Sequence, residues 1–144
     1  AQLSRGLGDV YKRQSLASSK IAKYTSVRKK LIDFQRKFSR GHGLIADGRD
    51  MGSVIFPSAD LKIFLTASVK VRADRRYKEL IARGENVSLR DLERRIALRD
   101  KGDRERKVSP LIAGEGAIVI DASEKSVNEV IKEIIHYFDL IPSV

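Results

Sequence analysis

Two runs of charged residues in this chain have the composition of a site for an anionic ligand. The first is DGRD, Asp47 to Asp50, in which an arginine lies between two carboxylates beside a glycine. The second is RDKGDRER, Arg99 to Arg106, which interleaves arginines with aspartates. An arginine guanidinium pairs with a phosphate through two parallel hydrogen bonds, and a carboxylate accepts hydrogen bonds from hydroxyl or amino groups. Each run by itself is also typical of a turn with a local ion pair or of a solvated charged surface.

Three apolar segments around these runs predict β-strands. They are GLIADG (43–48), LKIFLTA (61–67) and AIVIDA (117–122). Their almost continuous apolarity is typical of a sheet that is covered on both faces. In parallel sheets ligands bind beyond the carboxyl ends of the strands, and DGRD follows the first of these segments. The first charged run is therefore expected at the carboxyl end of a strand.

Apolar spacing predicts four helices, so the fold class is α/β with a parallel sheet. The first spans 25–38, and the second begins near Val69 and ends at Gly84. The third and fourth begin at Ser88 and Ser126, and each of these serines is followed three positions later by an acidic residue, which is the pattern of a helix N-terminal cap. The third is expected to bury Leu89, Leu92 and Ile96. The fourth is expected to bury Val127, Val130, Ile131, Ile134 and Phe138.

Composition narrows the kinds of protein that these elements can form. The 144 residues carry a formal net charge of +10, which favours anionic partners. The absence of cysteine excludes disulfides and thiolate metal sites and is typical of a cytoplasmic protein. The two histidines, His42 and His136, leave little for a zinc site, and no apolar run is long enough to span a membrane. Residues 1–14 end in DVYKRQ, which resembles the translation of a transposase sequencing adapter, so we expect them to form a disordered non-native leader, with 15–144 as a partial domain.

Taken together, the motifs of this chain resemble bacterial cytidylate kinase, a nucleoside-monophosphate kinase, from about Ser18 to Phe138. The resemblance is carried by GRDMG followed by Phe-Pro, by RADRRYKEL, by RDKGDRERKVSPL and by AIVIDAS. It implies a truncated parallel sheet of the P-loop NTPase type with about three remaining strands, and a basic lid at about 72–107. It also implies transfer of the ATP γ-phosphoryl group to CMP or dCMP, with ATP and Mg²⁺ as cofactors. Neither nucleic acid nor a membrane is implied as a partner, and the full-length family is expected to be monomeric.

The resemblance assigns a role to each matching residue. Ser19 and Arg28 match residues that contact the cytosine, and Asp50 matches a residue that helps to recognise it. Arg49 matches a ligand of the CMP phosphate, Arg99 and Asp103 match residues that contact the ribose, and Arg106 matches a further CMP contact. Arg75 and Arg76 match residues that contact the ATP phosphates. Arg49 and Arg106 are the implied catalytic residues. A phosphate-binding loop of the form G-x-x-x-x-G-K-[ST], which cradles the ATP phosphates, does not occur in the sequence.

The lack of this loop leads us to expect that the chain has no kinase activity alone and folds poorly. Two other readings stay open. One is a basic nucleic-acid-binding module, against which stand the 6% aromatic content and the mixing of arginines with acids. The other is a non-catalytic half that completes a separate N-terminal part.

Overall fold

A computed structural model describes residues 21, 24–39, 43–105, 107 and 109–142. The chain forms two units that divide between Ala46 and Asp47, and each is described by itself. The expected leader, residues 1–14, lies outside the described residues.

The first unit contains the helix predicted over 25–38. Helix α2 (Thr25–Arg36) continues into a 3-10 turn, η1 (Lys37–Ser39), so the prediction is confirmed. The rings of Phe34 and Phe38 contact each other edge to face, with centroids 5.1 Å apart. More than half of each of these side chains is exposed.

The strand predicted over 43–48 is wrong. Residues 43–47 have no regular secondary structure, and the side chain of Ile45 is fully exposed. A strand exists only where its backbone hydrogen-bonds to a neighbouring strand. In the described residues β1 and β2 pair with each other and neither pairs with this segment, so its backbone forms no ladder.

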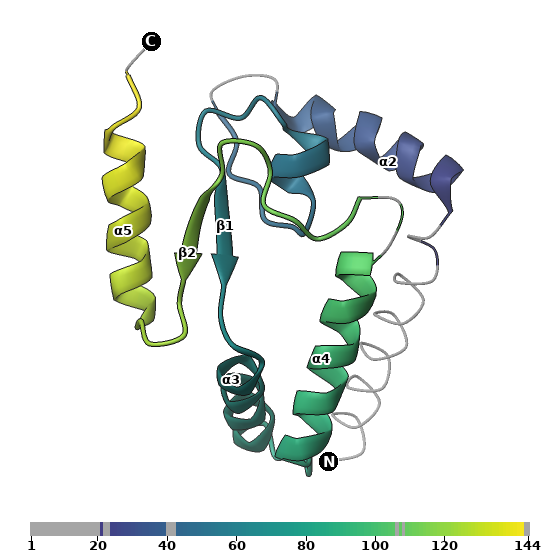
Figure 1. The fold of residues 1–144 in the computed structure, drawn as a ribbon, viewed down its shortest axis with the longest axis vertical. Coiled ribbons are helices and arrows are strands. Elements are labelled where there is room, and N and C mark those ends of the chain that lie inside the picture. Colours follow the sequence, from purple (N-terminus) through teal and green to yellow (C-terminus); the bar gives the residue numbers. More distant parts are fainter. Residues whose placement is uncertain (1–20, 22–23, 40–42, 106, 108, 143–144) are drawn as a thin grey trace. The chain divides into compact units, whose positions relative to one another are not determined.

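The sheet consists of β1 (Ile63–Thr66) and β2 (Ile118–Asp121), which run parallel. Ile63 lies opposite Ile118 and Thr66 opposite Asp121. Two of the three predicted strands are thus confirmed, and the expected number of about three is corrected to two in the described residues. Figure 1 shows α3 following β1 and α5 following β2, the order expected of an α/β fold. The expectation that both faces of the sheet are covered is wrong, because Leu65 and Val119 are each more than half exposed.

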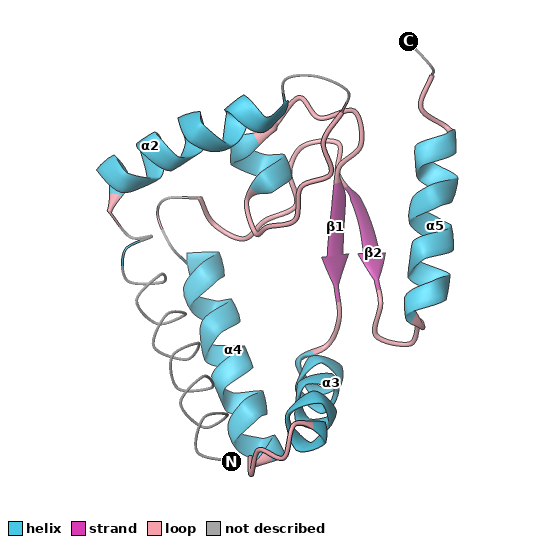
Figure 2. Ribbon diagram, turned by 180° about the vertical axis from the view of Figure 1, so that it is seen from behind, coloured by secondary structure: helices cyan, strands magenta, loops and turns pink. Residues whose placement is uncertain are grey.

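Helices α3 (Val69–Ala82) and α4 (Leu89–Glu105) are joined by residues 83–88 and pack against each other, and we call the pair the helical hairpin (Figure 2). Ser68 caps α3 by accepting a hydrogen bond from the Val71 N–H, and the chain leaves α3 through Gly84, whose φ of 75° suits glycine. The Ser88 hydroxyl accepts from the Asp91 N–H at the start of α4, as predicted. The hairpin has an apolar core of Ala73, Leu80 and Leu92, against which Tyr77, Val87 and Ile96 pack. Leu89 is exposed, contrary to prediction, because it precedes the turn of α4 that meets α3.

Helix α5 (Val127–Asp139) begins with the predicted capping box. The Ser126 hydroxyl accepts from the Glu129 N–H, and the Glu129 carboxylate accepts from the Ser126 N–H at 2.7 Å. Of the five residues expected to be buried, Val130 is buried and Ile134 is half-buried, but Val127, Ile131 and Phe138 are exposed. The physical reason is that only one side of α5 faces β2 (Figure 1).

None of the helices in the described part of the chain combines the length and the apolarity that crossing a membrane requires.

Candidate functional site

The loop that carries DGRD is held by the backbone that precedes both strands. Asp50 is followed by a single π-helical turn, η2 (Met51–Ile55), and its carbonyl accepts from the N–H groups of Val54 and Ile55 at 2.9 and 3.1 Å. A Cβ added to Gly114, just before β2, would lie 2.6 Å from the Gly52 carbonyl oxygen. The backbones therefore approach here as closely as two glycines permit.

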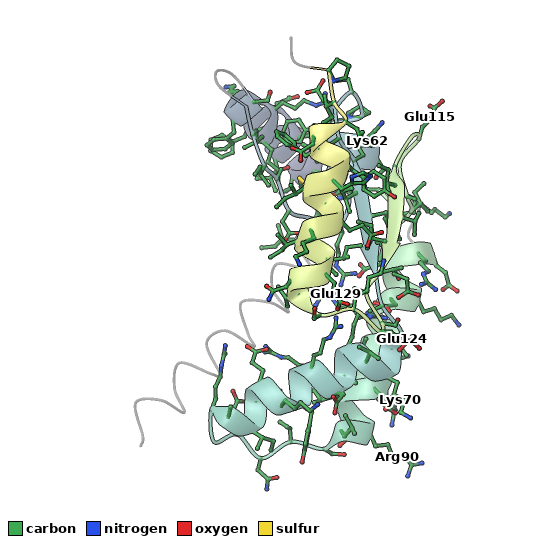
Figure 3. All side chains as sticks on the ribbon, turned by 90° about the vertical axis from the view of Figure 1, so that its left-hand side faces the viewer. Lys62, Lys70, Arg90, Glu115, Glu124 and Glu129 are labelled. Carbon is green, nitrogen blue, oxygen red and sulfur yellow. The ribbon has the colours of Figure 1, made fainter. Side chains whose placement is uncertain are left out.

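This placement corrects the expected position of the DGRD loop. It was predicted at the carboxyl end of a strand, but residues 43–47 are not in the sheet. The loop instead lies against residues that lead into the sheet, since Gly52 also approaches Lys62, which precedes β1. Figure 3 shows Lys62 toward the end of the sheet where β1 begins.

Helix α4 brings the second charged run to the first. Nη1 of Arg49 donates to Oδ2 of Asp103, and Nε of Arg99 lies 3.9 Å from the same oxygen. The Asp103 side chain is 17% exposed, the Arg49 side chain 34% and the Arg99 side chain 60%. Asp50, next to Arg49 in the chain, is buried. Two runs that are distant in sequence therefore meet, as an anion site built from both requires.

A second ion pair lies one turn away on the same helix. Arg72, in the first turn of α3, binds both carboxylate oxygens of Asp100 through its two Nη atoms, with Nη1 at 3.1 Å from Oδ1. Its Nε donates to the carbonyl of Ala67 at 2.9 Å. We call Arg49, Arg72, Arg99, Asp100 and Asp103 the arginine–aspartate cluster.

Asp100 is buried, and its pKa reflects the charges around it. The hydrogen bonds from Arg72 hold the pKa of Asp100 below its usual value. Burial opposes this, and the charges of Arg72, Arg49 and Arg104 add to the lowering. The two ion pairs thus share one electrostatic environment.

Sequence reasoning missed Arg72 and Asp100. The signal that could have found them is periodicity: Leu92, Ile96 and Asp100 follow one another at intervals of four, so Asp100 continues the face of α4 that packs on α3. A carboxylate on a packed face requires a cation from the facing helix.

The other predicted site residues lie elsewhere or outside the described residues. Nη2 of Arg75 donates to the carbonyls of Ala122 and Lys125, at 2.6 and 3.2 Å. Arg76 pairs with Glu79 on the exposed side of α3 at 2.5 Å. Arg28 is on α2, in the first unit. Ser19 and Arg106 fall outside the described residues.

The cluster has the chemistry of an anion site and not of a metal site. Its three arginines exceed its two aspartates by one positive charge, and guanidinium groups match the oxygen geometry of phosphate. Among the described residues, no group of three or more histidine, cysteine, aspartate and glutamate side chains is arranged to hold a metal ion. These residues do not fit a Mg²⁺ site of their own.

A short parallel sheet flanked by helices, with this cluster beside it, is consistent with the class of nucleoside-monophosphate kinases. The family model described as cytidylate kinase matches residues 12–140. The chain belongs to the cytidylate kinase family.

Curated relatives agree with this assignment. The chain is 54% identical over 115 residues to the cytidylate kinase of Methylococcus capsulatus, a match that covers 80% of this chain and 52% of the relative. It is 47% identical over 130 residues to that of Dichelobacter nodosus (89% and 58%) and 47% identical over 127 residues to that of Ralstonia nicotianae (88% and 55%). The chain therefore spans slightly more than half the length of these relatives.

Proposed function

We propose that this chain carries the CMP-binding part of a cytidylate kinase, an enzyme that transfers a phosphoryl group from ATP to CMP or dCMP. The observation that supports the proposal most is the meeting of Arg49, Arg99 and Asp103. The family assignment names the nucleotide, and the meeting of these side chains supplies the groups to hold it.

Each group of the nucleotide has a matching side chain in this proposal. The phosphate takes Arg49, which pairs with Asp103 in the structure and can exchange that carboxylate for a phosphate. Asp103, released from Arg49, accepts from a ribose hydroxyl, and Arg99 lies beside it.

Asp50 provides the selectivity for cytosine. Cytosine presents an exocyclic amino donor where uracil presents a carbonyl acceptor. A buried carboxylate accepts from the amino group and repels the carbonyl, so CMP is favoured over UMP.

Phosphoryl transfer requires the reacting groups to be positioned and their charge neutralised, rather than covalent chemistry by the protein. ATP and Mg²⁺ would supply the transferred group and part of that neutralisation. These 144 residues include no G-x-x-x-x-G-K-[ST] loop to hold them. We therefore propose that this chain alone binds CMP but does not phosphorylate it.

Isothermal titration calorimetry of the 144-residue chain at low ionic strength tests the proposal. CMP is expected to bind with one site per chain and UMP more weakly. Arg49→Ala is expected to weaken CMP binding by about tenfold or more, because a charge-assisted hydrogen bond contributes about 1.5–3 kcal/mol. A coupled assay of ADP release with CMP, ATP and Mg²⁺ is expected to show no turnover.

Arg90→Ala is the matched control, since it removes the same charge from the first turn of α4, where Figure 3 shows the side chain pointing away from the ribbon. It is expected to change CMP affinity by less than about twofold. Equal CMP affinity in Arg49→Ala and the unmodified chain would contradict the proposed site. Clear turnover would contradict the proposed need for a phosphate loop outside these residues.

A further inference from the structure

Within the arginine–aspartate cluster, the proposed function uses Arg49, Arg99 and Asp103 but not the pair of Arg72 with Asp100. We propose that Arg72 and Asp100 are positioning residues, which hold α4 against α3 so that Asp103 and Arg99 face Arg49. The inference rests on the proposed function for its ligand, but the geometry that it concerns can be measured without one.

All three nitrogens of the Arg72 guanidinium donate hydrogen bonds. Nε donates to the Ala67 carbonyl, immediately after β1, and both Nη atoms donate to Asp100. Arg72 therefore connects the end of β1 to the second half of α4. A single rotation of the side chain would break all three hydrogen bonds, so the pair resists sliding of the helix.

Fixing Asp100 also fixes the residues that meet Arg49. Residues three and four apart lie on the same side of a helix, so Asp100 and Asp103 share a face of α4, as do Arg99 and Asp103. If α4 rotated about its axis, Asp103 would turn away from the loop that carries Arg49.

Apolar packing holds the other end of this hairpin. The core residues of α4 are Leu92 and Ile96, in its first half, and Leu98 beyond them is 61% exposed. Asp100 is the next residue of the packed face and is only 7% exposed. A carboxylate as buried as this depends on its partner, whereas the exposed pairs of Glu79 with Arg76 and Arg83 contribute little.

Arg72→Gln tests the inference, because it removes the cation without touching Arg49, Arg99 or Asp103. In ¹H–¹⁵N spectra of the arginine Nε–Hε groups, the Arg49 signal is expected to move toward that of a solvent-exposed arginine. CMP affinity is expected to fall by about tenfold with the binding stoichiometry unchanged. Arg83→Gln, which breaks an exposed pair at the end of α3, is expected to change neither the Arg49 signal nor CMP affinity.

A double-mutant cycle separates positioning from general loosening of the fold. Once Asp103→Asn has removed the partner of Arg49, adding Arg72→Gln is expected to weaken CMP binding by less than about threefold more. Effects that multiply fully would overturn the inference, because they would mean that Arg72 acts independently of Asp103.

An Arg49 signal and a CMP affinity that are both unchanged in Arg72→Gln would also overturn it. If the unmodified chain does not bind CMP, the proposed function fails, and the Arg49 signal alone decides the positioning role. If Arg72→Gln does not fold, Asp100→Glu takes its place with the same expected results, because it keeps the charge and displaces the carboxylate by one methylene.

Discussion

Asp100 is a buried carboxylate that stabilises the folded state only while its carboxyl group is ionised. Its pKa is held below the ordinary value of 3.8, first by the hydrogen bonds from Arg72. A carboxyl group with a lowered pKa in the folded state stabilises that state above its unfolded pKa and loses this contribution as the pH falls through the folded value. The pair with Arg72 is therefore fully formed at neutral pH.

Asp100→Asn is expected to lower the free energy of unfolding by about 1–3 kcal/mol at pH 7, because Arg72 is left with a neutral partner. The difference from the unmodified chain is expected to shrink as the pH falls below the ordinary value of 3.8 and through the lower folded-state pKa of Asp100, where the carboxylate loses its charge. Urea denaturation at a series of pH values measures both. Glu105→Gln, which removes an exposed pair with Lys101, is the control and should change stability little. A difference that is independent of pH would show that the Asp100 charge does not contribute.

The predicted site residues could be found from sequence only in part. Arg49, Arg99 and Asp103 belong to two charged motifs that the family resemblance identifies, and the structure brings them together. Arg72 and Asp100 lie within the motifs RADRRYKEL and RDKGDRER, but the resemblance assigned neither of them a role. Their pairing became visible only when α3 and α4 were placed side by side.

At the scale of the elements, two glycines differ in whether their position has room for a side chain. Gly102 lies inside α4, and a Cβ there would meet no heavy atom within 4 Å. Gly114 precedes β2, and a Cβ there would lie 2.6 Å from the backbone oxygen of Gly52.

Gly102→Ala is expected to raise the free energy of unfolding by about 0.5–1 kcal/mol, because alanine loses less backbone entropy in a helix. Gly114→Ala is expected to lower it by more than about 1 kcal/mol, because the loop that carries Arg49 must move. Urea denaturation of the two variants in parallel gives the comparison. Similar effects in both would contradict the close approach of residues 52 and 114.

The helix boundaries were predictable because they depend on neighbours in sequence. Ser68, Ser88 and Ser126 each accept a hydrogen bond from a backbone N–H three residues later, and Gly84 adopts a positive φ at the end of α3. The strand over 43–48 could not be established in this way, because a strand depends on a partner from another part of the chain.

At the scale of the whole molecule, apolar side chains remain exposed on the second unit. Leu65 and Val119 are exposed on the sheet, and Ile131, Ile135 and Phe138 form a stripe on α5 at intervals of four and three residues. Contiguous exposed apolar surface and short sheets with open edges favour association between molecules.

The 144-residue chain is therefore expected to self-associate at micromolar concentration. The double variant Ile135→Lys with Phe138→Lys is expected to shift the distribution toward monomer, because it replaces apolar surface by charge. Sedimentation velocity over a concentration series measures this, with circular dichroism to verify that the helices persist. Lys132→Glu, which changes the charge of α5 without removing apolar surface, is the control. A monomer at every concentration of the unmodified chain would contradict the expectation.

The sequence by itself determined the helices, two of the strands and the family, because these follow from hydrogen bonds between near neighbours, apolar periodicity and motif residues. Only the tertiary structure decided that Arg49 pairs with Asp103 across 54 positions, that Arg72 pairs with Asp100 across 28, and that half of α5 is uncovered. Such pairings and burials depend on where distant parts of the backbone pass each other, which no local pattern of residues specifies.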